Sequence, residues 1–196
     1  MIKHAKTEHP VQDFIAERWS PYGFADHAVS ETDLRCLFEA ARWAASSFNE
    51  QPWSYIVATK ARETEFARLL SCLVEANQDW AKAAPVLALG VATLEFKRNG
   101  KPNRVALHDL GLATGNLVAE ATARGLAVHQ MGGILPDRAR EIYEIPEGSE
   151  VVTGIAIGYA GEPDSLPEEI RNRDLAPRER KPQREFVFGA AWREPF

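Results

Sequence analysis

Residues 40–58 read AARWAASSFNEQPWSYIVA, and this stretch joins the end of a predicted helix to the start of a predicted strand. Upstream, residues 30–33 (SETD) resemble a capping box, and apolar residues then recur at helical spacing to about Ala45. Downstream, residues 53–58 alternate as the side chains of a strand do. The corner at residues 46–51 gathers two hydroxyls and two side-chain amides, which indicates a hydrogen-bonding role.

The rest of the chain alternates between helical spacing and short apolar runs. A charged, turn-rich segment at 95–104 is expected to be a loop, and Gly125 fits a helix C-cap. The pattern predicts helices at about 62–74, 105–124 and 136–143, and strands at 86–93, near 126–131 and at 151–160.

The segment 105–124 is apolar almost all round, so its helix is expected to be buried. Gly111 and Gly115 lie four residues apart on it, and each costs about 1 kcal/mol relative to alanine in a helix. Close approach of another backbone, for example from a partner subunit, would compensate for that cost. The neighbours His108 and Asp109 point about 100° apart on the helix, so they are not expected to pair.

The last part of the chain combines two opposite tendencies. Residues 161–182 are rich in proline and charge and are too polar to form a core of their own. Phe186, Phe188 and Trp192 then end the chain with large apolar groups. We therefore expect this tail to cross a surface and to end docked, either on its own core or on a partner.

Composition limits the classes of protein. A chain of 196 residues with 45% hydrophobic content is expected to form a single domain over 1–196. The net charge of −5 argues against binding to nucleic acid, which needs clustered positive charge. Because we find neither an apolar run of about 18 residues nor a signal peptide, we expect no membrane insertion and a cytoplasmic location.

Several common kinds of site lack their motifs. The sequence has no Gly-x-Ser-x-Gly elbow, no Gly-x-Gly-x-x-Gly turn and no P-loop. The five histidines lack metal-binding spacing, and the two cysteines, Cys36 and Cys72, lie far apart. We therefore predict no metal site and no disulfide.

The remaining polar groups suit a flat, phosphorylated cofactor. Arg18-Trp19-Ser20 offers a cation and a hydroxyl, and Arg178 and Arg180 alternate, so they project to the same side of an extended chain. The planar fork of arginine donors suits phosphate oxygens. The stretch 131–133 (MGG) ends a predicted strand without bulky side chains, which lets a ring system lie close.

Together these segments resemble the nitroreductase family, the FMN-dependent oxidoreductases that take hydride from NAD(P)H. The resemblance covers nearly the whole chain and keeps the order of the family's segments. It rests on ERWSPYGF, AARWAASSFNEQPWSYIVA, NQDWAKAAPVLAL, HDLGLATGNLVAEATARGLAVHQMGGI, GIAIGYAGEP and RERKPQ.

The resemblance implies a set of residues around FMN. Relatives with a glutamate in the stretch near the flavin ring use it, and Gly132 stands there in this chain, so no catalytic side chain is assigned and flavin N5 carries the chemistry. The implied cofactor-binding residues come in four groups: Arg18, Trp19 and Ser20; Ser46, Ser47 and Asn49, which generally reach the flavin from the partner subunit, with Gln51 ordering their loop; Gln130, Met131, Gly132 and Gly133, near N5; and Arg178 and Arg180, at the phosphate.

The family also implies a fold, a reaction and an assembly. The fold is α+β in three layers, with a mostly antiparallel central sheet, helices on both faces, and a C-terminal segment that wraps the partner of a homodimer. The reaction is ping-pong transfer of hydride from NAD(P)H to a nitroaromatic, a quinone or a similar small acceptor. Two alternatives stay open: a flavin reductase or other specialised member, and a flavin-binding protein without turnover of NAD(P)H.

Overall fold

The computed structural model describes residues 3–196 and is built around one antiparallel sheet with the strand order β1-β2-β4-β3. Every neighbouring pair of strands is antiparallel, which agrees with the mostly antiparallel sheet that the family resemblance implies. The strands are β1 (Trp53–Thr59), β2 (Val86–Thr93), β3 (Ala127–Met131) and β4 (Ser149–Gly158).

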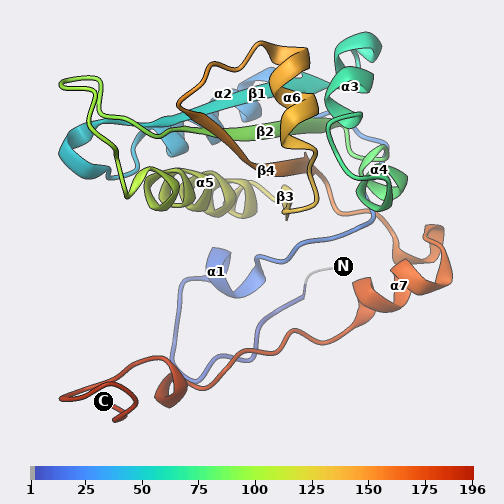
Figure 1. Cartoon of the computed structure of the whole chain (residues 1–196). Helices are drawn as coiled ribbons and strands as arrows, with labels where there is room; N and C mark the ends of the chain where they lie inside the picture. The colour runs from blue at the N-terminus through green and yellow to red at the C-terminus, as the bar shows by residue number, and fades with distance from the viewer. Residues whose placement is uncertain (1–2) are drawn as a thin grey trace.

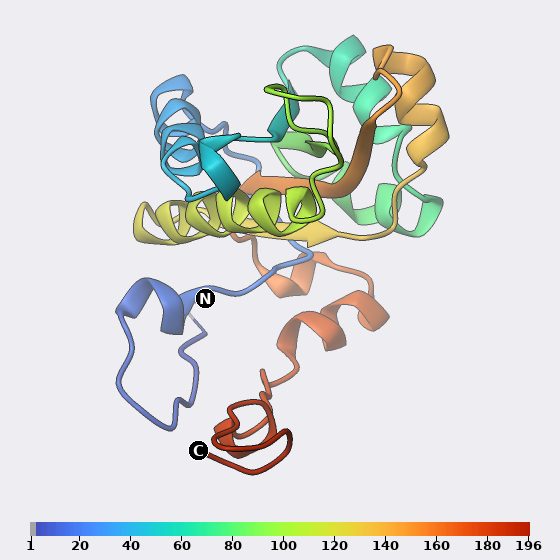
Figure 2. The ribbon, with the colours of Figure 1, turned by 60° about the vertical axis from the view of Figure 1, so that its left-hand side comes forward.

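Helices cover both faces of this sheet, which confirms the predicted three layers (Figures 1 and 2). Leu87 and Leu89 of β2 pack toward α3, α4 and α6, whereas Val86 and Ala88 pack toward α2 and α5. The strand is therefore buried on both faces, as its apolar run predicts. The helices are α1 (Asp13–Glu17), α2 (Glu31–Arg42), α3 (Glu63–Leu70), α4 (Glu75–Ala81), α5 (Ala106–Ala123), α6 (Pro136–Tyr143) and α7 (Glu168–Leu175).

Local signals place the helix ends well. Oγ of Ser30 accepts a 3.0 Å hydrogen bond from the amide of Asp33 and caps α2, which ends at Arg42, three residues before the predicted end. Gly125 has a φ of 74° just after α5, the left-handed conformation that a helix C-cap favours. The prediction of one helix at 62–74 is partly wrong, because α3 ends at Leu70.

The expectation that α5 is buried all round holds for only part of its surface. Leu110 and Leu117 are fully covered, but Leu112 is 41% exposed. A Cβ added at Gly111 or Gly115 would meet no atom within 4 Å. This face of α5 is open in the single chain.

The two ends of the chain form an extended arm beside the layers (Figure 1). Nζ of Lys3 donates to the carbonyl of Ala176, and the amide of Gln183 donates to a carboxylate oxygen of Glu8 at 3.1 Å. We call residues 3–17 and 162–196 the terminal arm. None of the helices described over residues 3–196 has the length and apolar character needed to cross a membrane.

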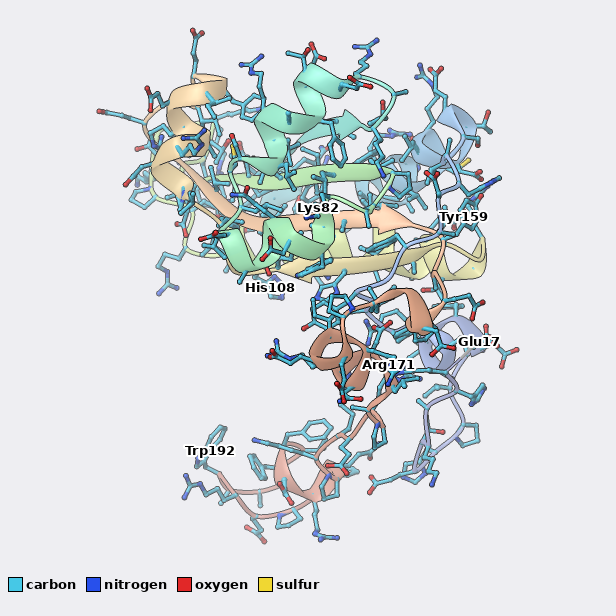
Figure 3. All side chains as sticks on the ribbon, turned by 90° about the vertical axis from the view of Figure 1, so that its right-hand side faces the viewer. Glu17, Lys82, His108, Tyr159, Arg171 and Trp192 are labelled. Carbon is cyan, nitrogen blue, oxygen red and sulfur yellow. The ribbon has the colours of Figure 1, made fainter. Side chains whose placement is uncertain are left out.

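The aromatic end of the chain does not dock on its own core, so that alternative is wrong. Trp192 lies at the far end of the terminal arm, away from the sheet (Figure 3), and is 81% exposed. Its ring packs edge-on against Phe188 at 5.0 Å between ring centres. The arm buries little apolar surface within the single chain.

Candidate functional site

The corner at residues 46–51 is held in an unusual backbone conformation. Phe48, Asn49 and Gln51 have φ angles of 53°, 55° and 52°, which side chains other than glycine adopt at a cost. The amide of Gln51 donates to Oγ of Ser46 at 3.0 Å, and its side-chain amide donates to the carbonyl of Asn49 at 3.1 Å. Gln51 thus ties the corner to itself.

A buried carboxylate fixes this corner to α5. Oδ2 of Asp109 accepts a 3.0 Å hydrogen bond from the amide of Ser47, and Asp109 is only 3% exposed. Oδ1 of Asp109 lies 3.3 Å from Nδ1 of His108, so the expectation that these neighbours do not pair is wrong. The side chain of His108 nevertheless remains mostly exposed.

The segment after Arg18 is anchored from two sides. Nδ1 of His129 on β3 donates a 2.8 Å hydrogen bond to the carbonyl of Pro21. The amide of Tyr22 donates to Oδ1 of Asp174 on α7 at 2.9 Å. Nη1 of Arg18 donates to Oγ of Ser20 at 3.0 Å, so the two predicted side chains are in direct contact.

Arginines from the two ends of the chain meet at one open cavity of about 530 Å³. Burial lowers the pKa of Arg18, and the charges of Arg178 and Arg180 lower it further. Because the three arginines line one cavity, their charges repel one another, and a bound anion would relieve this repulsion. The charged side chains around the cavity are Lys6, Arg18, Arg178, Arg180 and Lys181, against Glu8.

Arg178 also joins the two ends of the chain. Its Nη2 donates to the carbonyl of Ala16 at 2.8 Å, and its guanidinium donates to the carbonyls of Lys3 and Arg18. Arg180 instead donates to the carbonyl of its neighbour Glu179. Because most donors of Arg178 are already used, Arg180 and Arg18 have more capacity for an external anion.

The end of β3 has one open and one crowded glycine. A Cβ added at Gly132 would meet no atom within 4 Å, whereas one at Gly133 would lie 2.5 Å from Nδ2 of Asn77. The carbonyl of Gly133 accepts hydrogen bonds from this side-chain amide at 2.9 Å and from the amide of Val74 at 3.1 Å. Gly133 fixes the strand end to α4, and Gly132 leaves the surface beside it accessible.

An aromatic cluster lies between β3 and the Arg18 segment. The ring centres of Trp80 and His129 are 4.4 Å apart, and Tyr22 meets both rings edge-on. Burial lowers the pKa of His129, which therefore stays neutral at neutral pH. Trp19 is also buried, with the Lys3 ammonium 4.6 Å above its ring, so this residue packs inside the fold.

The predicted residues form three groups. Arg18, Ser20, Arg178 and Arg180 lie together. Residues 46–51 form a second group, held by their own hydrogen bonds. Residues 130–133 form the third group, at the end of β3. Over the described residues, no hydrogen bond joins the corner 46–51 to the arginines. The sequence analysis did not predict that Asp109, Asn77 and Asp174 hold these segments in place by hydrogen bonds. For Asp109, an acidic residue on an otherwise apolar helix could have indicated such a role.

Comparisons with known proteins identify the family of the chain. A model of the nitroreductase family matches residues 15–159. An uncharacterised 15.4 kDa protein of Mycolicibacterium smegmatis is 31% identical over 126 residues, which span 64% of this chain and 84% of that protein. A protein of Archaeoglobus fulgidus with the provisional name NADH dehydrogenase/NAD(P)H nitroreductase is 27% identical over 141 residues, spanning 69% and 77% of the two chains.

A solved structure described as an oxidoreductase containing FMN superposes with a TM-score of 0.90. It is 32% identical, and the match covers 96% of each chain. The family match spans the sheet, the corner 46–51 and the end of β3. On these grounds the chain belongs to the nitroreductase family.

Proposed function

We propose that the protein is an FMN-dependent oxidoreductase that takes hydride from NAD(P)H and passes it to a small acceptor such as a nitroaromatic or a quinone. Family membership supports the general oxidoreductase reaction. FMN is supported by the structural relative that contains it, and NAD(P)H by the name of the Archaeoglobus relative. The observation that carries the proposal is the cationic cavity joined by Arg18, Arg178 and Arg180.

The residues present fit the phosphate of FMN. Arg18 is hydrogen-bonded to Ser20, and a phosphate here would accept charge-assisted hydrogen bonds worth about 1.5–3 kcal/mol each. The repulsion that lowers the pKa of Arg18 would then be replaced by attraction. In this account Arg18, Ser20 and Arg180 hold the phosphate, while Arg178 adds charge and joins the chain ends.

The end of β3 fits the flat ring system. Gly132, just after β3, presents no side chain and has free space where a Cβ would be, and Gln130 on β3, two residues earlier, is exposed. Met131 is buried, so its side chain packs into the core. We assign Gln130, Met131, Gly132 and Gly133 to the ring, with Gly133 held in place by Asn77.

FMN, when bound, supplies the hydride chemistry at N5. The protein binds the phosphate and orients the ring. Asp109 and His129 hold the surrounding segments in place and take no part in the reaction. No side chain is assigned as a catalytic acid or base. Because both substrates use one site in turn, ping-pong kinetics are expected.

We further propose that the chain is one domain that acts as a homodimer. The face of α5 around Gly111 and Gly115 is uncovered in the single chain, and the aromatic C-terminal end docks on no core. Both leave apolar surface that a second copy would cover. The C-terminal segment would wrap that copy, and Ser46, Ser47 and Asn49 would reach its flavin. A cytoplasmic location stays a prediction of the sequence.

The cofactor content of purified variants tests the phosphate assignment. Arg178→Ala combined with Arg180→Ala removes two charges from the cavity and is expected to purify colourless. Arg184→Ala is the control, because this exposed arginine of the terminal arm does not line the cavity. A folded double variant that retains full FMN would refute the assignment.

A further inference from the structure

Phe48 is an exposed aromatic residue in a strained position. It lies between Ser47 and Asn49 in the corner, is 73% exposed, and has a φ of 53°. A bulky residue in the left-handed region strains the backbone. Neither burial nor backbone geometry explains a phenylalanine here, so its ring is available for another contact.

A second loop meets this ring and brings a positive charge to it. Phe96 packs edge-on against Phe48, with 5.9 Å between ring centres. The guanidinium of Arg98 lies 4.0 Å from the centre of the Phe48 ring and 5.4 Å from that of Phe96. Stacking uses the face of the guanidinium and leaves the N–H groups at its edge free to bind.

The two loops are fastened together and ordered. The amide of Lys97 donates to a carboxylate oxygen of Glu50 at 2.8 Å, which joins the loops directly. The amide of Phe96 donates to the carbonyl of Lys101 at 2.9 Å, so the loop closes on itself as a tight turn. In the part of the chain that the structure describes, no carboxylate forms a salt bridge with Arg98.

We propose that Phe48, Phe96 and Arg98 form a subsite for the substrate, and that it selects planar aromatic molecules that carry an anionic group. This inference rests on the proposed function, because residues on either side of Phe48 are those assigned to the flavin. The open face of Phe48 stacks on the aromatic ring, and the edge of Arg98 binds the anion.

Two substrates of the reaction have this chemistry. One is an aromatic acceptor with a carboxylate, and the other is the adenosine 2′-phosphate of NADPH. Each has a close analogue without the charge, respectively the corresponding amide and NADH. The ratio of kcat/KM within each pair measures the effect of the anionic group alone, because the reacting group is the same in both members.

The experiment measures steady-state kinetics of the FMN-loaded protein with 4-nitrobenzoate against 4-nitrobenzamide, and with NADPH against NADH. We expect the wild type to prefer the charged member of at least one pair. Arg98→Gln should reduce kcat/KM for that member by about tenfold, through KM, while its uncharged analogue is unaffected. Phe48→Leu should reduce kcat/KM for both members, because it removes the stacking surface.

Lys101→Gln is the matched control, since it removes a charge from the same loop at an exposed side chain outside the subsite. Equal preferences in wild type and Arg98→Gln for both pairs would overturn the proposal. A Phe48→Leu variant that alters the monomer–dimer equilibrium but not KM would also overturn it, because the ring would then be a subunit contact. If NAD(P)H is not oxidised with any acceptor, the proposed function fails instead.

Discussion

The amide of Ser47 donates a 3.0 Å hydrogen bond to Oδ2 of Asp109, a carboxylate that is only 3% exposed. This contact joins the corner that follows α2 to the first turn of α5. The corner has strained residues, and this bond holds it to a helix of the layers, so we expect its position to depend on this buried acid.

Asp109→Ala is therefore expected to weaken FMN binding. The variant leaves the Ser47 amide without its partner, and the lost hydrogen bond to a charged group destabilises the corner by about 1.5–3 kcal/mol. If FMN binding must restore about half of that cost, the affinity falls by about tenfold. Quenching of FMN fluorescence on titration gives the dissociation constant. Asp109→Asn keeps an acceptor oxygen and should lose less. Equal FMN affinity in wild type and Asp109→Ala would contradict this role.

The neighbouring glycines at the end of β3 are expected to respond differently to alanine. Gly133→Ala places its Cβ 2.5 Å from Nδ2 of Asn77 and 2.8 Å from Cγ2 of Val74, so the Asn77 side chain must give up its bond to the Gly133 carbonyl or α4 must shift, and we expect a loss of about 1–3 kcal/mol of stability. Gly132→Ala meets no protein atom and should leave the melting temperature unchanged while weakening FMN binding. Matching effects of the two variants on stability would be inconsistent with this geometry.

Gly115→Leu tests whether the open face of α5 lies against a second copy. Leucine is about 1 kcal/mol better than glycine in a helix and finds free space in the single chain, so the fold should persist. A backbone packed on this face would be displaced, giving a monomer by light scattering. Ala67→Leu on an exposed part of α3 controls for added apolar surface. A Gly115→Leu dimer of normal stability would refute packing at this face.

The pH dependence of stability should report on His129. Burial lowers the pKa of its ring below the ordinary value of 6.5. As pH falls below 6.5, the unfolded chain binds a proton that the folded chain does not, so stability is lost toward acid. His129→Asn keeps a donor for the Pro21 carbonyl and removes the titration. Urea unfolding from about pH 7.5 to about pH 5.5 should show a smaller loss for the variant, whereas parallel losses would contradict the account.

Local signals were sufficient for most of the fold. The apolar run of β2 and the proline at the start of α6 identified both elements within their observed bounds. The sequence missed α4, because seven residues with only Trp80 and Ala81 buried give little periodicity. It also missed α7, a polar helix in which Asp174 is the buried residue.

The candidate site residues were assigned from the family resemblance, because their spacing in the sequence does not bring them together. Arg178 and Arg18 are 160 residues apart, and their contact depends on how the two chain ends meet. Ser47 and Asp109, which share a hydrogen bond, are 62 residues apart in the sequence, so no local pattern predicts their contact. The sequence does not predict the positive φ of Phe48 either, because phenylalanine rarely adopts this conformation.

The central claim is that this chain uses FMN to move hydride from NAD(P)H to an acceptor. The most direct test is the visible absorption spectrum of the FMN-loaded protein without oxygen, recorded before and after NADPH or NADH and again after 4-nitrobenzoate. We expect the flavin bands to bleach with the nucleotide and to return with the acceptor. Bound FMN whose spectrum neither nucleotide changes would contradict it and identify a flavin-binding protein without turnover.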